Sequence, residues 1–69
     1  MKLLNQQGQP LKAGDIVQTF RGEAYRFDFG REPHKAGSTG RVYVTPLEGG
    51  SQREFFPSVI GAAWVNEGA

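Results

Sequence analysis

The chain has 69 residues, of which eight are Lys or Arg and seven are Asp or Glu, and it contains no cysteine. A formal net charge of +1 is far below the basic excess of a dedicated nucleic-acid-binding protein. Without cysteine, neither disulfides nor thiolate-bound zinc can stabilise the fold, so we expect a single domain over residues 1–69 that depends on its apolar core.

The sequence shows no apolar segment that is long enough for secretion or membrane insertion. The first residues, Met1–Asn5, contain two leucines before the sequence turns polar. A secretory signal needs an apolar run of about 7–15 residues, and a membrane helix needs about 20. We therefore expect a cytoplasmic protein with no membrane partner.

Two short strands are predicted in the N-terminal part of the chain. Leu3 and Leu4 form the first, and a polar turn follows them. The run Ile16–Phe20 is rich in β-branched and aromatic residues and forms the second. Gly22 then allows a tight turn, because glycine adopts positive φ without steric cost. Between the two strands, Leu11 is expected to tuck under the sheet as an anchor.

The clearest alternation in the sequence begins at Tyr25. Tyr25, Phe27 and Phe29 should point to one side of a strand, and Arg26 and Asp28 to the other. The aromatic stripe suits either the core or a platform that stacks bases or peptides, and so small a domain needs it in the core. Tyr25 is the expected exception, because its hydroxyl requires water or a hydrogen-bond partner.

A polar loop, Gly30–Gly40, precedes the next alternating strand. This loop is longer than the two to five or so residues usual in a hairpin, a length that indicates either a functional segment or a plain connector. In the strand that follows, Val42 and Val44 should face inward, and Pro46 ends the strand because proline cannot donate to a ladder. The residues expected on its outer face are Arg41, Tyr43 and Thr45.

The C-terminal part predicts two further strands, over 52–56 and 62–65, separated by one 3₁₀ turn at Pro57–Gly61. Together the elements predict an all-β fold, a small partly open barrel of about five strands. Val17 is expected to point inward, and a bulge in this strand would reverse that direction. The predicted core consists of Val17, Phe20, Phe27, Phe29, Val42, Val44, Phe55 and Trp64.

Two short segments resemble SH3 domains. Phe55–Gly61 is similar to the Phe-Pro-Ser segment that forms a 3₁₀ turn before the closing SH3 strand, and Gly14–Val17 is similar to first strands of SH3-like barrels. The resemblance implies the barrel but not the proline-rich peptide groove, because Ile60 stands where that groove has a tyrosine and Trp64 lies in the closing strand. The run Ser38–Val44 also resembles small uncharacterised phage or prophage proteins.

The residue types needed for catalysis or metal binding are sparse. His34 is the only imidazole and has no acidic cluster beside it, whereas a catalytic metal site normally has three protein ligands. The loop Gly30–Gly40 departs from the phosphate-binding motif in its glycine and lysine spacing, and a strand follows it instead of a helix. We therefore expect no enzymatic activity, no metal and no cofactor.

The loop tip leaves a weaker anion-binding alternative open. The backbone N–H groups of residues 37–40 could form a nest for an anion beside Lys35 and Arg41. Small residues of this kind are also what an ordinary solvated loop tip requires, and that interpretation is favoured.

Basic and aromatic residues of the predicted outer face and of the loop form the candidate binding surface. Open sheet edges and the exposed Arg–Tyr pair suit a protein partner or self-association, so the leading hypothesis is a non-catalytic protein-interaction module. The alternative is binding of single- or double-stranded nucleic acid through the same surface. The candidate residues are Arg26, Arg31, His34, Lys35, Arg41 and Tyr43.

Overall fold

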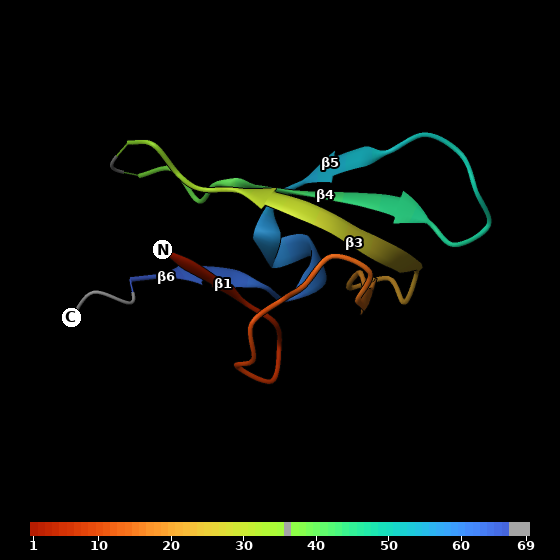
Figure 1. Ribbon diagram of the computed structural model, residues 1–69, viewed down its shortest axis with the longest axis horizontal. Helices are drawn as coiled ribbons and strands as arrows, with labels where there is room; N and C mark the ends of the chain where they lie inside the picture. The colour runs from red at the N-terminus through yellow and green to blue at the C-terminus, as the bar shows by residue number, and fades with distance from the viewer. Residues whose placement is uncertain (36, 67–69) are drawn as a thin grey trace.

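The computed structural model describes residues 1–35 and 37–66 and consists mainly of antiparallel strands joined by turns and loops (Figure 1). In these residues there is one 3₁₀ helix, η1 (Pro57–Ile60), which precedes β6 (Ala63–Val65). The strands are β1 (Lys2–Leu4), β2 (Ile16–Gln18), β3 (Ala24–Arg31), β4 (Arg41–Pro46), β5 (Arg53–Phe55) and β6 (Ala63–Val65). The predicted all-β class and the predicted 3₁₀ turn are confirmed.

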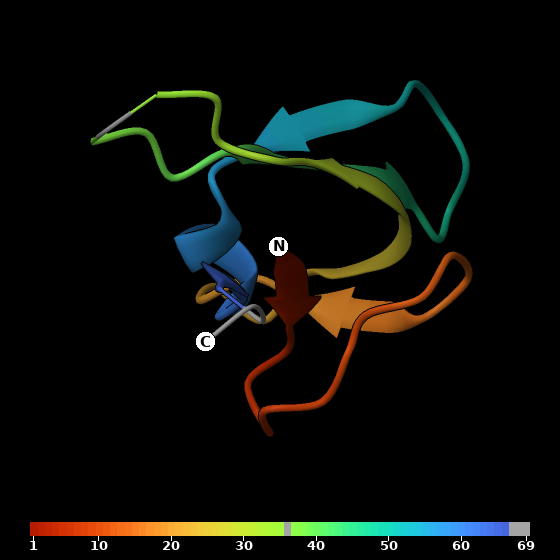
Figure 2. The same ribbon diagram turned by 60° about the vertical axis from the view of Figure 1, so that its left-hand side comes forward.

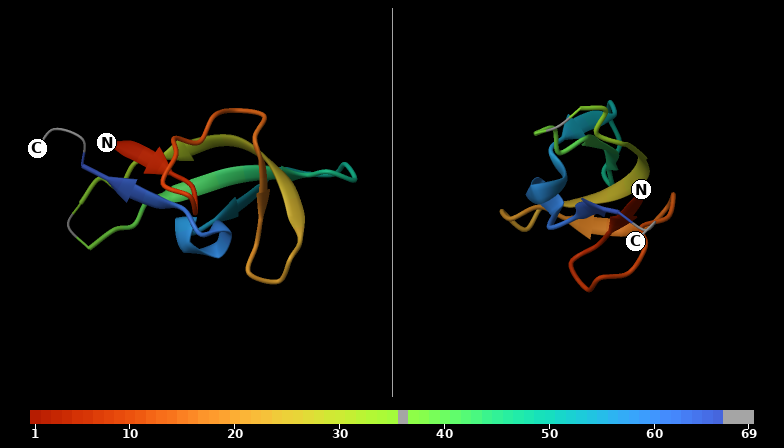
Figure 3. Two further views of the ribbon diagram at one scale, coloured as in Figure 1. Left: turned by 90° about the horizontal axis from the view of Figure 1, so that it is seen from below. Right: turned by 90° about the vertical axis from the view of Figure 1, so that its left-hand side faces the viewer.

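Within the described residues, six strands form two sheets. One is a meander in the order β2-β3-β4-β5, and the other pairs β1 with β6. Figure 2 shows the meander curling around η1, with β1 and β6 on its open side, and Figure 3 shows β1 and β6 side by side from below. In the described part of the chain no ladder joins the two sheets, so the barrel is not closed and has one strand more than the expected five.

The core lies between the two sheets. Val42 and Val44 of β4 are completely buried there, and Val17 and Phe27 are buried beside them, as the alternation predicted. Leu11, Phe55 and Trp64 are partly buried and pack against this cluster, so the expected anchoring role of Leu11 is confirmed. The sequence-based core omitted Leu3, Tyr25, Ile60 and Ala62, all of which are buried.

Tyr25 is buried and is not the exception that its hydroxyl suggested. Its ring meets the ring of Phe55 edge to face, with a centroid distance of 5.5 Å and an interplanar angle of 75°. This geometry is the favoured one for an aromatic pair, because the positive edge of one ring meets the negative face of the other. The pair ties the inner face of β3 to β5.

Phe20 was expected in the core but is 76% exposed. Because side chains alternate along a strand, the buried Val17 places Thr19 on the inner side and Phe20 on the outer side. Thr19 is accordingly buried, and its hydroxyl accepts hydrogen bonds from the backbone N–H groups of Arg21 and Glu23 at 3.3 Å. The β2–β3 turn therefore has a buried threonine at the position next to its exposed phenylalanine.

Phe29 was also expected in the core but is 51% exposed, because a β-bulge interrupts β3. Phe27 lies opposite Val44 and Phe29 lies opposite Tyr43, so β3 advances by two residues where β4 advances by one. The extra residue, Asp28, shifts the alternation by one position, which moves Phe29 from the inner to the outer face.

Two glycines allow the sheets to approach closely at Trp64. A Cβ atom added at Gly30 of β3 would lie 2.8 Å from Cζ2 of Trp64 and 3.0 Å from a methyl carbon of Leu3. A Cβ atom at Gly40, where φ is +76°, would lie 2.6 Å from Nε1 of Trp64 and 2.6 Å from the carbonyl oxygen of Arg31. The indole of Trp64 in β6 thus packs directly against the backbone of Gly30 and Gly40, which is possible because neither residue has a side chain.

Candidate functional site

The bulge in β3 places two aromatic rings together on the outer face of the meander. The rings of Phe29 and Tyr43 are stacked, with centroids 4.5 Å apart and an angle of 18° between their planes. Tyr43 was predicted to face outward, and it does so as the cross-strand partner of Phe29. Because about half of the Phe29 side chain remains exposed, the stack presents an apolar surface to solvent.

Arginine side chains lie over the rings of this surface. The guanidinium of Arg31 lies 6.0 Å from the centroid of Tyr43, and that of Arg41 lies 4.3 Å from the centroid of Phe56. Phe56, which follows β5, is 53% exposed. Cations over ring faces are attracted by the ring quadrupole, by about 0.5–1 kcal/mol at an exposed site. We call Phe29, Arg31, Arg41, Tyr43 and Phe56 the Arg–aromatic face.

One carboxylate organises the centre of the Arg–aromatic face. Glu54 of β5 accepts a hydrogen bond of 2.8 Å from the hydroxyl of Tyr43, and the same oxygen lies 3.8 Å from Nε of Arg41. This hydrogen bond raises the pKa of Tyr43 above its ordinary value, because the carboxylate stabilises the protonated phenol. Glu54 therefore holds the Tyr43 hydroxyl in place and pairs with one of the two cations of the face.

Arg26, another predicted site residue, lies on β3 before the bulge and pairs with Asp28 at 3.4 Å. Asp28 also accepts a hydrogen bond of 2.6 Å from the Thr45 hydroxyl and one of 3.1 Å from the Gln52 side-chain amide. Chiefly through the Thr45 bond, then through Gln52 and Arg26, these contacts hold the pKa of Asp28 below its ordinary value. Arg26 thus belongs to the hydrogen-bonded network of the bulge, whereas Arg31 and Arg41 are the arginines that lie over the rings.

The loop between β3 and β4 brings the remaining predicted residues to the edge of this face. His34 and Lys35 line a shallow depression of about 220 Å³ together with Arg31, Arg41 and Glu54. Five of the six predicted residues therefore meet around one region, and Arg26 does not. Sequence reasoning missed Phe29, Phe56 and Glu54.

The loop tip uses some of the N–H groups that an anion nest would need. The N–H of Ser38 donates to the carbonyl oxygen of Lys35 at 3.1 Å, and the N–H of Gly40 donates to the hydroxyl oxygen of Ser38 at 3.2 Å. These bonds are those of an ordinary polar turn. They leave the solvated loop tip as the better interpretation of residues 37–40.

Neither a cluster of metal-binding side chains nor a membrane-spanning helix occurs in the described residues. Within residues 1–35 and 37–66, no three His, Cys, Asp or Glu side chains are grouped so that they could hold a metal ion. Over the same residues, no helix has the length and apolar character needed to cross a bilayer.

Comparisons of this chain with protein-family models, with curated protein sequences and with solved structures found no significant match. The class that the fold and the face define is accordingly a small all-β domain of antiparallel sheets with an exposed arginine and aromatic surface.

Proposed function

We propose that this protein is a non-catalytic protein-interaction module that binds its partner through the Arg–aromatic face. The observation that carries the proposal is the stacked pair of Phe29 and Tyr43, held on an exposed sheet face with Arg31 beside it. Aromatic residues and arginine are enriched at the energetic centres of protein interfaces.

The charge pattern of the face favours a protein partner over a polyphosphate backbone. Arg26 pairs with Asp28 and Arg41 pairs with Glu54, so two of the arginines on the outer side already have carboxylate partners. Proteins bind a nucleic-acid backbone through Lys and Arg side chains that replace the counterions of its phosphates. A carboxylate beside such a cation repels the phosphates and weakens this binding. Mixed charges around apolar rings are instead complementary to another protein surface.

A second candidate function is binding of single-stranded nucleic acid. The observation that favours it is the exposed outer side of the Phe29–Tyr43 stack next to the Arg31 guanidinium and the Lys35 loop. Bases stack on exposed aromatic rings whatever their sequence, and this contributes about 1–3 kcal/mol per base. The two candidates use one surface and differ in how binding responds to salt.

We also propose that the two sheets form a partly open SH3-like barrel, of phage or prophage origin and acting in the cytoplasm. The support for the barrel is the chain order, in which η1 leads directly into β6, as in the segment that resembles SH3 domains. Ile60, which replaces the groove tyrosine, is buried, so the proposal excludes the proline-rich peptide groove. The genes that neighbour this one in its genome would test the proposed origin.

A matched pair of double variants tests the proposed binding face. Phe29→Ala/Arg31→Ala removes one ring and one cation from it, whereas Phe20→Ala/Arg21→Ala removes a similar exposed pair from the β2–β3 turn. We expect a protein that co-purifies with the wild type from source-cell extracts to be retained by the second variant. With the first variant its recovery should fall at least about tenfold, because central aromatic and arginine residues dominate interface energies.

Equal recovery with both variants would contradict the proposed face. Labelled single-stranded and duplex oligonucleotides, measured by fluorescence anisotropy at low and high salt, test the second candidate. Binding to single strands that weakens with salt and is lost in Phe29→Ala/Arg31→Ala would favour nucleic acid over protein as the partner.

A further inference from the structure

The outer edge of β2 has backbone groups that point away from the sheet. The N–H of Thr19 donates to the carbonyl oxygen of Glu23, and the N–H of Phe27 donates to the carbonyl oxygen of Asp15. Hydrogen-bonded pairs alternate with non-hydrogen-bonded pairs in an antiparallel ladder. Ile16 opposite Arg26 and Gln18 opposite Ala24 are therefore non-hydrogen-bonded pairs. Their N–H and C=O groups face the open edge.

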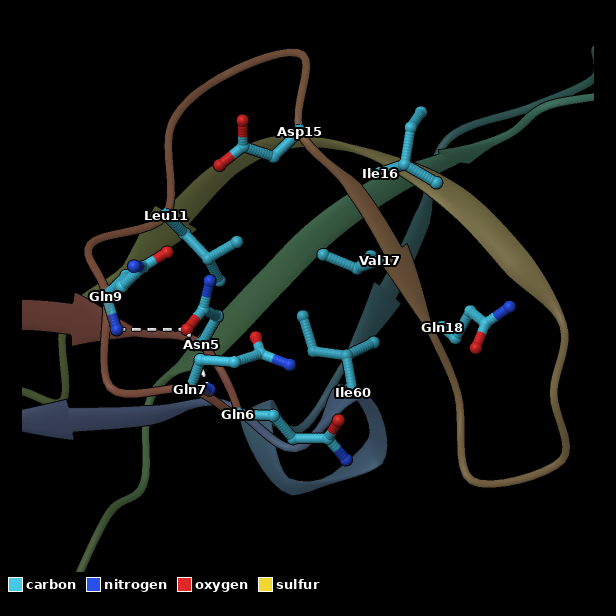
Figure 4. A pocket seen from close by; sticks show the side chains of 10 residues that line it. All are labelled: Asn5, Gln6, Gln7, Gln9, Leu11, Asp15, Ile16, Val17, Gln18 and Ile60. Carbon is cyan, nitrogen blue, oxygen red and sulfur yellow. Dashed lines mark hydrogen bonds between the residues drawn. The ribbon is translucent and has the colours of Figure 1, made fainter.

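A groove runs along this edge. It has a volume of about 500 Å³ and lies between β2 and the 5–11 segment that follows β1 (Figure 4). Its apolar floor is formed by Leu11, Val17 and Ile60. The remaining walls are mostly side-chain amides, and Asp15 is the one charged residue of the lining. The amide residues that line the groove are Asn5, Gln6, Gln7, Gln9 and Gln18.

The groove walls are held by local hydrogen bonds. The side-chain oxygen of Asn5 accepts hydrogen bonds of 2.9 Å from the N–H groups of Gln7 and Gln9, which fixes the turn of the facing wall. A carboxylate oxygen of Asp15 accepts a hydrogen bond of 2.9 Å from the N–H of Lys12. Among the described residues, none donates to or accepts from the edge groups of Ile16 and Gln18 outside the sheet. The groove is therefore preorganised while the edge is left open.

Two other strand edges of the molecule, those of β5 and β1, are protected in ways that the β2 edge is not. The opposite edge of the meander, β5, carries the charged residues Arg53 and Glu54, which discourage strand addition. The outer edge of β1 is covered by the chain itself, through a bridge between Leu4 and Pro10 and the hydrogen bond from Leu11 to Leu3. The β2 edge has neither a charge nor a proline within Ile16–Gln18.

We propose that the free edge of β2 binds an extended, uncharged segment of a partner protein by strand addition. The segment's main chain pairs with the N–H and C=O groups of Ile16 and Gln18, which gives the affinity. Its side chains alternate between the two faces. Those that point inward meet the floor of Leu11, Val17 and Ile60 and are apolar. Those that point outward are uncharged polar residues, because the amide walls offer hydrogen bonds and little charge.

The probe that tests this proposal is an acetylated, amidated pentapeptide of sequence Val-Thr-Val-Thr-Val, added to ¹⁵N-labelled protein. We expect shifts of the Ile16 and Gln18 amide resonances in nuclear magnetic resonance spectra, with a Kd on the order of 0.1–1 mM for so short a segment. The same titration on Arg31→Ala should give the same Kd, because the groove is separate from the Arg–aromatic face. Binding of the peptide to the groove can therefore be confirmed or refuted whether or not the Arg–aromatic face binds a partner.

N-methylated peptides separate strand addition from other modes of binding. Successive N–H groups of a strand point to opposite edges, so methylation of the two threonine nitrogens blocks one edge and methylation of the other three blocks the opposite edge. One of these two peptides should bind like the parent, and the other should bind at least about tenfold more weakly. Loss of binding with both peptides, or with neither, would overturn the proposal.

A substitution at Gln18 tests the protein side. Gln18→Pro removes the N–H that faces the groove without removing a ladder hydrogen bond, a position at which edge strands tolerate proline. We expect Gln18→Pro to raise the Kd of the peptide about tenfold. Gln18→Ala, which keeps the N–H, should change the Kd by less than about threefold. The alternative occupant of this edge is a second copy of the protein. In that case the amide resonances of Ile16 and Gln18 would shift with protein concentration in the absence of peptide, and the proposal would be overturned.

Discussion

The two segments of β3, before and after the bulge, differ in their role although they come from one run of alternating residues. Before the bulge, Tyr25 and Phe27 are buried and hold the sheets together. After it, Phe29 is turned outward and lies in the Arg–aromatic face with Tyr43. The same residue type thus contributes to stability on one side of Asp28 and to a proposed binding surface on the other. One inserted residue in a strand is enough to divide a domain of this size between the two tasks.

The largest expected effect compares the two phenylalanines directly. Phe27→Ala should lower the free energy of unfolding by about 3–5 kcal/mol, because it leaves a cavity in the core. Phe29→Ala removes only a half-exposed ring and its stack with Tyr43, and should cost about 1 kcal/mol. Urea unfolding followed by circular dichroism measures both. Similar losses for the two variants would show that Phe29 is part of the core and that the bulge is absent.

The next effect concerns the close approach of the sheets on the inner side. Gly40→Ala should cost about 3 kcal/mol, because it combines a positive φ with a Cβ that meets Trp64 and the Arg31 carbonyl. Gly49→Ala is the matched control, since Gly49 has φ +98° with no atom within 4 Å of the added Cβ. It should cost about 1 kcal/mol from backbone strain alone. Equal costs in thermal or urea unfolding would mean that Trp64 does not pack against Gly40.

A smaller effect concerns the bulge residue itself. The contacts from Thr45, Gln52 and Arg26 lower the folded-state pKa of Asp28 below its unfolded value. Their contribution is therefore present above the unfolded pKa, near 3.9, and is lost as the pH falls through the folded value. Measured from pH 7 down to about pH 2.5, the stability advantage of the wild type over Asp28→Asn should shrink below about pH 4. An advantage that stays constant over this range would show that Asp28 makes no charge-dependent contact.

The smallest effects are expected for the arginines of the outer side. Arg31→Ala and Arg41→Ala should each change the free energy of unfolding by no more than about 0.5 kcal/mol, because both side chains are at the surface and exposed ion pairs contribute little. The same is expected for His34→Ala and Lys35→Ala in the loop. A loss above about 1 kcal/mol for Arg31→Ala would make this face structural and would weaken its proposed role in binding.

Much of the proposed binding surface could be found from the sequence, and the bulge in β3 explains why one of its residues, Phe29, was missed. Arg31, Arg41 and Tyr43 were placed on or beside one outer face by alternation within β4 and by their nearness to the loop, and the structure brings them together. Phe29 was placed in the core because alternation was carried through Asp28 without interruption. Asp28 is held in the bulge by Thr45 and Gln52, which are far from it in sequence. The residues next to Asp28 in the chain therefore give no sign of the bulge.

Phe20 illustrates a different limit. Val17 and Phe20 are an odd number of positions apart, so regular alternation cannot bury both of them, and the structure buries Thr19 in place of the larger residue. Burying Thr19 satisfies the N–H groups of the tight turn through its hydroxyl, whereas a phenylalanine at that position would leave them without this acceptor. The burial of Val17 and the turn hydrogen bonds of Thr19 thus both favour Thr19 on the inner side and Phe20 on the outer side.

The sequence by itself determined the all-β class, the positions of most strands and the 3₁₀ turn before β6. These depend on local features, namely the period-two pattern of apolar residues and the placement of glycine and proline. The tertiary structure alone decided that β1 pairs with β6, that Phe29 leaves the core and that the β2 edge stays open in an amide-lined groove. Each of these outcomes depends on hydrogen bonds or packing between residues far apart in the chain, which no local pattern encodes.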